Sequence, residues 1–578
     1  MKLSDYVVDF LAKEGMTHIF EIVGGAITHL LDSAHGRKDI VPISMHHEMA
    51  AAIAAEGYSR AGENIGVAMA TSGPGATNLI TGIGSCFFDS IPCIFITGQV
   101  NTYEGRAKPS IRQAGFQEMD IVSVIKPLTK DAIFVKDPDK IRYYLEKAID
   151  TARSGRPGPV LLDIPMNIQR ADIDPGSLEP FHKEPDADFF DKLNDSVVRQ
   201  AAELINSSSR PIVLAGGGVR ASKAQDELLR FIRKTGMPVA ASLMGLDAFP
   251  GDDPLFAGMI GSYGNRYSNL AVANSDLLLA LGTRLDTRQT GTRPGTFARG
   301  AKIIHVDIDP HELNNKVKAD FPVKSDVKKF LTALNERVKA CDKARMRSWT
   351  QMIKRFKDRY PSHVNSSGDV IEPNFFMHKL SKLIPDAAII CADVGQNQMW
   401  AAQSLEIKNT QRFLTQGGMG SMGSSLAMGI GASFARPGDP VVVISGDGGF
   451  QLNTQELQTL YHHNLPVKII MLNNNCYGMV RQFQEQYFNS KFQSTVIGYS
   501  NPDFQGVVSA YKIDAMKISR AADIDGALKK LFSDMRPMFL EVGIDQAAKV
   551  LPKLSVNRPI EDQDPILPRD ELKENMVI

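Results

Sequence analysis

Two oxygen-bearing side chains at the ends of two apolar runs have the chemistry of a site for Mg²⁺ and a diphosphate. Asp447 closely follows the apolar run 441–444, and Asn474 closely follows the run 467–472. A carboxylate and an amide oxygen are hard ligands suited to Mg²⁺, which takes few protein ligands and completes its shell with water and phosphate. Gly446 and Gly448 flank Asp447 and let the backbone approach a diphosphate closely. The spacing therefore predicts a magnesium–diphosphate site.

The elements around these residues must bring the two side chains to one edge of a sheet. Both apolar runs indicate buried strands. Residues 450–463 between them have helical periodicity, with Leu452, Leu457 and Leu460 on one side. The pattern predicts a strand–loop–helix–strand unit whose polar side chains lie at the carboxyl ends of the strands, where parallel sheets bind ligands. An ordinary βαβ unit with polar loop ends is the alternative interpretation.

Composition and charge exclude several classes of protein. The chain has 578 residues, which predicts roughly three to four domains of about 150 residues each. Lys+Arg and Asp+Glu both number 65, so no basic excess favours nucleic acid or an anionic membrane. Five cysteines without C-x-x-C spacing argue against a disulfide framework and favour a reducing cytoplasm. The sequence shows no signal-peptide core and no apolar stretch long enough to span a bilayer.

The alternation of apolar runs and helical segments divides the chain into three α/β units and an arm. Residues 1–170, 190–340 and 374–545 each predict a parallel sheet with helices on both faces. The tail 546–578 is rich in proline and charge and predicts an ordered surface arm rather than a domain. No convincing repeat relates the first unit to the third. The other expected elements are strands at 67–70, 93–98, 160–164, 211–219 (running into a glycine turn), 238–242, 277–281 and 303–308, a charged helical segment at 327–359, and linkers at 170–186 and 360–373.

One glutamate in the first unit has the setting of a buried proton carrier. If the segment around it is helical, Glu48 shares a face with Ala51, Ala52 and Ala55. A carboxyl group on a face of small residues is expected to be buried, and burial favours its neutral form and lets it share a proton. A solvated helix glutamate is the alternative, and it is the commoner setting for this residue type.

From the amino-terminal helix to about Pro552, the chain resembles the acetohydroxyacid (acetolactate) synthase group of thiamine-diphosphate enzymes. The motifs that match are GGA at 24–26, HHEMAAAIAAEGYSRA, SGPGATNL, DSIPCIFITGQV, GFQE at 115–118, GRPGPVLLDIP, LGTRLDTRQTG, GDG and LNNNCYGMV. The resemblance implies three doubly wound parallel-sheet domains: pyrimidine-binding, central FAD-binding and diphosphate-binding. It also implies a homodimer or homotetramer, with thiamine diphosphate between the first domain of one chain and the third domain of another.

The resemblance implies a role for each matching residue at the thiamine diphosphate site. Asp447 and Asn474 would bind Mg²⁺ together with the carbonyl of Cys476, and Glu48 would engage the pyrimidine ring. Gln396 would touch the diphosphate, and Met422 would hold the cofactor bent, although a core methionine is the alternative for this position. The residues lining the reaction centre would be Gly25, Phe116, Gln117, Met479 and Phe483.

The second unit is similar to the FAD-binding domain of the group. A strand followed by three glycines is by itself a weak nucleotide signal, because this sequence is also a common tight turn. The resemblance implies a flavin that is structural and not redox-active. The residues at the matching positions are Arg156, Gly216, Gly217, Gly218, Ser242, Leu243, Met244, Gly258, Gly261, Arg284, Asp307 and Asp326.

Departures from the pattern of the group lie on the side that receives the acceptor. Phe483 stands where the group has tryptophan, and Asn101, Met166 and Thr287 stand where it has proline, lysine and aspartate. Arg288, which the resemblance assigns to the acceptor carboxylate, is kept; its planar fork suits that anion. A surface or flavin-contacting arginine is the alternative. The resemblance therefore implies an intact donor half and an altered acceptor half.

The resemblance implies a carboligase that decarboxylates pyruvate and transfers the hydroxyethyl unit to a second pyruvate, giving 2-acetolactate for branched-chain amino acid biosynthesis. One alternative is a relative that passes the unit to another ketone, such as a keto-sugar nucleotide. A simple decarboxylase needs no acceptor arginine, and a non-catalytic scaffold needs neither Glu48 nor Asp447. The expected partners are pyruvate, a carbonyl acceptor, further copies of the chain and a regulatory subunit, with no nucleic acid and no membrane.

Overall fold

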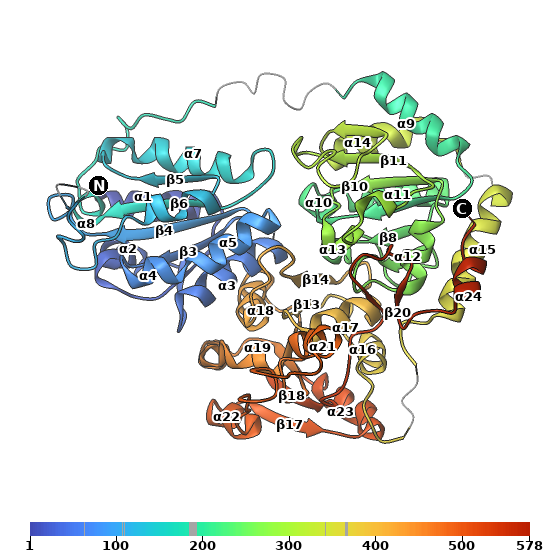
Figure 1. Ribbon diagram of the computed structural model, residues 1–578. Helices are drawn as coiled ribbons and strands as arrows, with labels where there is room; N and C mark the ends of the chain where they lie inside the picture. Colours follow the sequence, from blue (N-terminus) through green and yellow to red (C-terminus); the bar gives the residue numbers. More distant parts are fainter. Residues whose placement is uncertain are drawn as a thin grey trace.

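The computed structural model (Figure 1) describes residues 1–577 except residues 63, 107, 109, 184–192, 341–342 and 365–367. Three six-stranded parallel sheets follow one another along the chain, each with helices between its strands. Strands such as β3, β4 and β15 are apolar and inaccessible along nearly their whole length, because helices cover both faces of a parallel sheet. The expected fold class, three α/β domains with parallel sheets, is confirmed.

The first sheet has the strand order β2-β1-β3-β4-β6-β5. Its strands are β1 (His18–Glu21), β2 (Val41–Ser44), β3 (Gly66–Ala70), β4 (Cys93–Gln99), β5 (Asp131–Phe134) and β6 (Val160–Pro165). Its helices are α1 (Leu3–Lys13), α2 (Thr28–Ala34), α3 (Glu48–Ala61), α4 (Pro74–Asn78), α5 (Ile80–Asp89), α6 (Ile121–Ile125), α7 (Ile141–Arg153) and α8 (Met166–Gln169).

The central sheet has the strand order β12-β11-β10-β7-β8-β9, which is the Rossmann order. Its strands are β7 (Pro211–Ala215), β8 (Val239–Ala241), β9 (Phe256–Met259), β10 (Leu277–Leu281), β11 (Lys302–Asp307) and β12 (Phe321–Lys324). Its helices are α9 (Asp195–Ser207), α10 (Gly217–Ala221), α11 (Gln225–Thr235), α12 (Arg266–Ala273), α13 (Thr287–Thr290), α14 (Val327–Arg337) and α15 (Lys343–Arg359).

The third sheet has the strand order β14-β13-β15-β16-β18-β17. Its strands are β13 (Ile389–Ala392), β14 (Arg412–Thr415), β15 (Val441–Gly446), β16 (Val467–Asn473), β17 (Asp514–Ile518) and β18 (Met538–Gly543). Its helices are α16 (Pro373–Ser381), α17 (Gln396–Ser404), α18 (Ser424–Ala435), α19 (Asp447–Gln451), α20 (Leu457–His462), α21 (Gly478–Tyr487), α22 (Phe504–Ala510) and α23 (Ile524–Leu531).

Two of the expected helices are divided in the structure. The segment 450–463 is split into α19, a 3₁₀ turn (Thr454–Glu456) and α20. Leu452 is 52% exposed whereas Leu457 and Leu460 are inaccessible, so the three leucines do not share one buried face. The side-chain amide of Asn453 donates to the carbonyl of Gly423, which holds the break in place. The charged segment 327–359 is likewise divided, into α14 and α15.

Helices α3 and α18 pack the first domain directly against the third (Figure 1). A Cβ atom added at Gly57 would lie 2.2 Å from the carbonyl oxygen of Met428, and one added at Gly431 would lie 1.8 Å from that of Ala54. The two backbones touch at both places because glycine leaves no side chain between them. This contact fixes the helix that begins at Glu48 against the helix that follows Met422.

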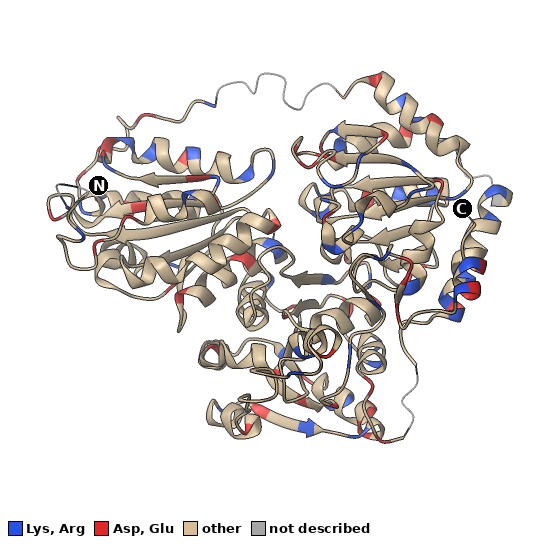
Figure 2. Ribbon diagram, in the orientation of Figure 1, with Lys and Arg blue, Asp and Glu red and all other residues tan. Residues whose placement is uncertain are grey.

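The described part of the tail, residues 546–577, is ordered and lies along the central domain (Figure 1). It forms a two-stranded antiparallel pair, β19 (Lys553–Leu554) and β20 (Gln563–Asp564), and a helix, α24 (Arg569–Glu574). The side-chain amides of Asn269 and Asn274 donate to tail carbonyls at 3.0 and 2.8 Å. Basic residues of α15 face acidic residues of α24 (Figure 2), and Arg359 pairs with Glu571 at 2.9 Å. No helix within the described ranges is long and apolar enough to cross a membrane.

Candidate active site

Asp447 is the first residue of α19 and lies at the carboxyl end of β15, as the sequence predicts. It is 2% exposed, and burial raises the pKa of its carboxyl group. The hydroxyl of Tyr499 and the amide of Asn501 each donate to its Oδ2 atom at 2.9 Å. The Asn501 amide also donates to Asn473 Oδ1 at 2.9 Å, so one side chain connects the ends of β15 and β16. A bound cation would offset the cost of keeping this carboxylate charged in a buried position.

Asn474 and Gln396 are brought together beside this carboxylate. The Asn474 amide nitrogen donates to Gln396 Oε1 at 2.7 Å, which leaves Asn474 Oδ1 as the acceptor for a ligand. Helix α21 approaches both side chains closely, since a Cβ atom at Gly478 would lie 1.8 Å from Gln396 Oε1. Gln396, Asn474 and Asp447 therefore occupy one edge of the third sheet, with Gly446 and Gly448 on either side of the aspartate.

Cys476 is suited to offer its carbonyl oxygen rather than its sulfur. Burial raises the pKa of its thiol to about 11, so the sulfur is protonated near neutral pH. The thiol donates to the carbonyl of Gln546 at 3.8 Å. Asp447, Asn474 and the Cys476 carbonyl would together offer Mg²⁺ the oxygen ligands that it prefers. In the described part of the chain, no group of three or more His, Cys, Asp or Glu side chains is placed to hold a metal.

Asp393, which the sequence analysis did not single out, holds the loop that precedes α18. It follows β13 and is 1% exposed, and burial raises the pKa of its carboxyl group to about 6. It accepts hydrogen bonds from the Gly423 N–H at 2.9 Å and from the hydroxyls of Ser425 and Ser445 at 3.1 and 3.2 Å. The sequence could have indicated Asp393, because it is an acidic residue directly after an apolar run, which is the pattern that identified Asp447.

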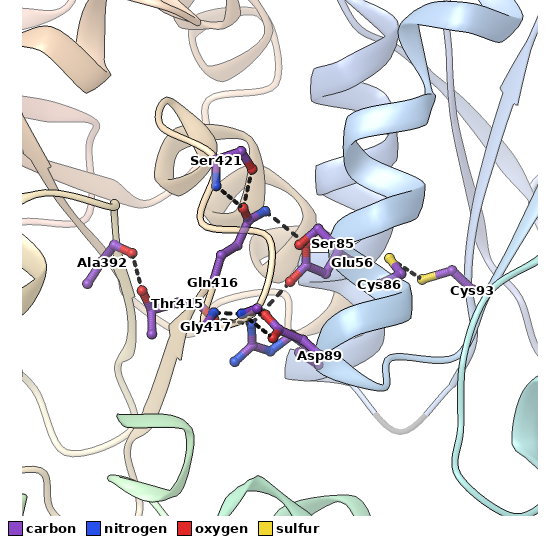
Figure 3. A network of polar contacts seen from close by, with 12 residues as sticks. Glu56, Ser85, Cys86, Asp89, Cys93, Ala392, Thr415, Gln416, Gly417 and Ser421 are labelled. Carbon is purple, nitrogen blue, oxygen red and sulfur yellow. Dashed lines mark hydrogen bonds and ion pairs between the residues drawn. The ribbon is translucent and has the colours of Figure 1, made fainter. Parts of the chain in front are cut away.

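Glu56 is the centre of a second buried network, which joins α3 to the third domain (Figure 3). Arg60 pairs with its carboxylate at 3.1 Å, and the Ser85 hydroxyl donates to it at 2.8 Å. The Gln416 amide donates to the same carboxylate from the third domain, at 3.2 Å. The Arg60 guanidinium also donates to the carbonyl of Thr415 at 2.6 Å. Burial raises the pKa of Glu56, and the Arg60 charge opposes that shift.

Met422 is held between these two networks. On one side, Gln416 Oε1 accepts the N–H of Ser421 at 3.1 Å and closes the 416–421 loop (Figure 3). On the other side, the Gly423 N–H donates to Asp393. The backbone is thus fixed on one side of Met422 by Gln416, which in turn bonds to Glu56 of the first domain, and on the other side by Asp393. This is the setting that a residue shaping a cofactor would need.

Gly25, Glu48 and Gln117 gather around one turn of the first domain, residues 71–75. The Ala26 N–H, next to Gly25, donates to Thr71 Oγ1 at 3.2 Å. The Asn78 amide donates to Glu48 Oε2 at 2.9 Å. A Cβ atom at Gly73 would lie 3.1 Å from the Cβ of Gln117, and one at Gly75 would lie 3.4 Å from Glu48 Oε1. Segments distant in the sequence therefore meet here.

The expectation that Glu48 is buried is wrong for the single chain, where it is partly exposed. Glu48 is the first residue of α3 and lies at the edge of the domain, whereas Ala51, Ala52 and Ala55 lie further along the helix and are inaccessible. Phe116 is 86% exposed. Among the described residues, the hydrogen-bond partner of Glu48 lies in the first domain, and no contact joins Glu48 to Asp447.

Most of the residues predicted for the flavin line a cavity of about 1680 Å³. Burial raises the pKa of Asp307 in its wall to about 6. Arg156 pairs across the domain boundary with Asp309 and Glu312, at 3.1 and 2.8 Å. The predicted residues in its lining are Arg156, Gly217, Gly218, Ser242, Leu243, Met244, Arg284, Asp307 and Asp326. Gly216, Gly258 and Gly261 lie outside the lining.

Arg288 and Met479 line the same cavity, so the flavin region and the acceptor side are continuous. The guanidinium carbon of Arg288 lies 5.9 Å from the ring centre of Tyr263. Phe483, on α21, is 46% exposed, and its ring centre lies 4.8 Å from that of Tyr487. Lys553 of the tail lies over both of these rings. The sequence did not predict this lysine as part of the site, although it is the one charged residue in the apolar stretch 550–554.

Family models match parts of all three domains. Models of the thiamine pyrophosphate (thiamine diphosphate) enzymes match the N-terminal binding domain at residues 1–124, the central domain at 198–334 and the C-terminal binding domain at 393–542.

Three relatives cover nearly the whole chain. Acetolactate synthase isozyme 2 large subunit of Escherichia coli is 38% identical over 96% of this chain and 97% of its own. Acetolactate synthase 2 of Nicotiana tabacum is 38% identical over 96% of this chain and 83% of its own. Probable acetolactate synthase large subunit of Methanocaldococcus jannaschii is 37% identical over 95% of this chain and 92% of its own. The chain that places Asp447, Asn474 and Gln396 at one edge of its third sheet thus belongs to the thiamine-diphosphate-dependent acetolactate synthase family.

Proposed function

We propose that the protein is an acetolactate synthase, which decarboxylates pyruvate and adds the remaining two-carbon unit to a second pyruvate to give 2-acetolactate. The observation that carries this proposal is the edge of the third sheet, where Asp447, Asn474 and Gln396 lie together in a chain whose relatives are named for this activity. Arg288, in the wall of the adjoining cavity, is the side chain suited to the acceptor carboxylate.

Mg²⁺ and thiamine diphosphate fit the residues present. Asp447, Asn474 and the Cys476 carbonyl would hold Mg²⁺, and Gln396 would contact the diphosphate. When bound, thiamine diphosphate supplies a nucleophilic carbon, and the ring that carries this carbon stabilises the negative charge left after CO₂ departs. The half-buried side chain of Asn501 keeps the carboxylate of Asp447 in one orientation, so the protein orients this proposed ligand before a metal binds.

Glu48 is the proposed proton carrier. Asn78 occupies its Oε2 atom, while its Oε1 atom faces the open side of Gly75. We therefore assign Oε1 as the atom that holds the proton. In the single chain Glu48 is partly exposed and Phe116 is largely exposed. This exposure is what we would expect if another copy of the chain completed the site. The proposed assembly is accordingly a homodimer or a homotetramer, with a regulatory subunit as a further partner and the cytoplasm as its compartment.

The central cavity fits FAD. Its volume of about 1680 Å³ exceeds the range of roughly 300–1,000 Å³ typical of pockets for small ligands, as a dinucleotide requires. Gly217 opens α10 within its lining, where backbone N–H groups can face a diphosphate. Arg156, Arg284 and Asp307 offer polar contacts. The flavin would serve as a structural part of the wall.

The direct test is a product analysis. The purified protein is supplied with pyruvate, Mg²⁺ and thiamine diphosphate, and CO₂ and 2-acetolactate are measured by mass spectrometry. We expect one acetolactate for each CO₂. Loss of CO₂ with no acetolactate would contradict the proposal for the acceptor, and absence of CO₂ would contradict it altogether.

The flavin is tested separately. The protein as isolated should be yellow, and a denatured extract should contain FAD whose absorbance at about 450 nm does not fall during turnover with pyruvate. A fully active, colourless protein without flavin in the extract would overturn this part.

A further inference from the structure

The tail 546–578 extends beyond the central domain and reaches helix α21, which carries Phe483. The Leu554 N–H donates to the carbonyl of Ser262 at 2.7 Å, and the Ser262 N–H donates to the carbonyl of Arg288 at 2.8 Å. Two backbone hydrogen bonds therefore connect the tail to the residue proposed to bind the acceptor carboxylate. Lys553, immediately before Leu554, projects from this fixed point.

Lys553 packs its ammonium group against the aromatic wall of α21. It is only 6% exposed, and its Nζ atom lies 5.7 Å from the ring centre of Phe483 and 5.6 Å from that of Tyr487. Gln486, on the same helix, accepts a hydrogen bond from Nζ at 2.6 Å. The ammonium thus touches three residues within one turn and a half of α21, two of them through their ring faces.

The rings take the place that a carboxylate usually has beside a lysine. Throughout the described residues, no carboxylate lies within the 4 Å of an ion pair with Lys553. The nearby Asp564 accepts instead from the hydroxyl of Ser555 and from Gln486 at 3.3 Å. A buried cation without an ionic partner is costly unless other groups stabilise it, and aromatic faces do so. Burial lowers the pKa of Lys553, with Asp564 opposing that shift.

Lys549 offers the contrast within the same tail. It also reaches α21, but it does so through an ordinary ion pair with Glu485 at 2.5 Å, and it is 39% exposed. Among the described residues, the Lys549 ammonium lies over no ring of α21, unlike that of Lys553. The tail therefore makes two kinds of contact with α21, an exposed ionic contact and a buried contact on the aromatic rings.

We propose that Lys553 is a positioning residue that fixes the ring of Phe483 and thereby sets how firmly the acceptor is held. The inference rests on the proposed function for what the acceptor side does. Phe483 is half-exposed and its ring would be free to rotate if it were not held from the covered side. With the ammonium in place the ring keeps one orientation on the proposed acceptor side, so the acceptor meets a wall that is already ordered.

The consequence is a choice between two fates of the two-carbon unit. Each pyruvate that loses CO₂ yields acetaldehyde if the unit is protonated, and 2-acetolactate if the unit is added to a second pyruvate. A mobile Phe483 should weaken acceptor binding and leave decarboxylation unchanged, so acetaldehyde should rise at the expense of acetolactate.

The experiment compares Lys553→Met with Lys549→Met in the full-length, cofactor-loaded enzyme. Met keeps the length of the side chain and removes the charge. We expect Lys553→Met to raise the ratio of acetaldehyde to acetolactate by about tenfold, with CO₂ release within about twofold of the wild type. Lys549→Met should leave the ratio unchanged, and Lys553→Arg should restore most of it. Equal ratios in wild type and Lys553→Met would overturn the proposal.

A double-mutant cycle shows whether Lys553 acts through Phe483. In a Phe483→Ala background, Lys553→Met should add no further change to the product ratio. An undiminished effect in that background would show that Lys553 acts in another way and would overturn the proposal. If Lys553→Met fails to fold, Gln486→Ala, which removes the hydrogen bond to the ammonium, replaces it in the cycle.

A spectroscopic readout separates this inference from the proposed function. 4-Fluorophenylalanine at position 483 reports the setting of the ring by ¹⁹F NMR without any turnover. Its resonance should move in Lys553→Met and stay in place in Lys549→Met. If the wild type releases no CO₂ from pyruvate the proposed function fails, while an unmoved ¹⁹F resonance in Lys553→Met overturns the positioning role alone.

Discussion

The first and third sheets follow the same strand order, β2-β1-β3-β4-β6-β5 in one and β14-β13-β15-β16-β18-β17 in the other. After β3 the chain turns through Thr71 to Gly75, an uncharged turn around which Gly25, Glu48 and Gln117 gather. After β15, the corresponding strand, it enters α19 at the buried carboxylate of Asp447. One scaffold therefore supports an uncharged turn at one strand end and a buried carboxylate, the proposed ligand of a cation, at the other.

The two turns differ in how completely their own domain encloses them. Asp447 is held from its own domain, by Tyr499 and Asn501. The turn 71–75 contacts segments of the first domain, but its open side faces outward, where Phe116 is exposed. In the proposed cofactor site, the surroundings of Asp447 are therefore the rigid half-site and the surroundings of the turn 71–75 are the open half-site. Strand order alone predicts neither, which is why function must be argued from the side chains.

The largest expected effect tests the open half-site. Glu48→Gln should lower the rate of pyruvate turnover by about 10²- to 10⁴-fold, because the amide cannot carry the proton. Thiamine diphosphate binding, measured by calorimetry, should change little. Glu203→Gln, at an exposed position of α9, is the control and should be fully active. A Glu48→Gln enzyme with more than half of the wild-type activity would remove this glutamate from the mechanism.

The next effect concerns the rigid half-site and pH. The pKa of Asp393 is raised to about 6, so the folded protein binds this proton more tightly than the unfolded chain does. That contribution to stability is present at low pH and is lost as pH rises from about 4 to about 6. A pKa raised by about two corresponds to a contribution of about 3 kcal/mol to the free energy of unfolding.

In Asp393→Asn the side chain at this position is uncharged at every pH. Its melting temperature should therefore rise relative to the wild type as pH increases from 4 to 7, measured without Mg²⁺ or cofactor. Asp163→Asn in the first domain should show the same trend over a wider window, because burial raises the pKa of Asp163 to about 7. A pH-independent difference for Asp393→Asn would show that the raised pKa is wrong.

A smaller effect tests what holds Asp447 in place. Asn501→Ala removes the amide that connects the ends of β15 and β16. Outer partners of metal ligands typically contribute 10- to 100-fold in affinity, so the dissociation constant for Mg²⁺ should rise by about that factor. Activity at saturating Mg²⁺ should largely return. Gln451→Ala removes another side chain that contacts Asn501 and leaves Asp447 untouched, and it should leave Mg²⁺ affinity unchanged.

The smallest effect concerns the acceptor wall. Phe483→Trp presents a larger, flatter surface on the proposed acceptor side, and the resemblance to the family implies tryptophan at this position. One methylene in an apolar pocket is worth about 10- to 200-fold in selectivity, so the variant should gain preference for 2-oxobutyrate near the lower end of that range. The ratio of acetohydroxybutyrate to acetolactate in a competition assay measures it. A wild type that already favours 2-oxobutyrate strongly would show that position 483 does not set this choice.

Local sequence patterns predicted much of the fold and the centre of the site. The expected strands 441–444 and 467–472 are β15 and β16, and Asp447 and Asn474 lie at their ends. The reason is that apolar runs and the residues that end them are local features. No repeat was visible between the first and third units, yet their strand orders match, because any apolar run can form a buried parallel strand.

The residues that the sequence did not reveal are those whose partners lie far along the chain. Tyr499 and Asn501 reach Asp447 across more than 50 positions, and Gln416 reaches Glu56 across 360. Nothing local marks such pairs. The single helix expected at 450–463 was wrong for a similar reason, since Asn453 bonds to Gly423 at a distance of 30 positions and competes with the helix.

The buried cluster of Glu56, Arg60 and Gln416 limits how the protein can change over generations. Arg60 and Gln416 both bond to the buried carboxylate of Glu56, so replacing any one of the three leaves a buried charge or amide without its partner. A lineage cannot easily pass through such an intermediate, and the three positions should change together or remain the same. Sequences of distant relatives should therefore show these positions covarying, although 360 residues separate Glu56 from Gln416.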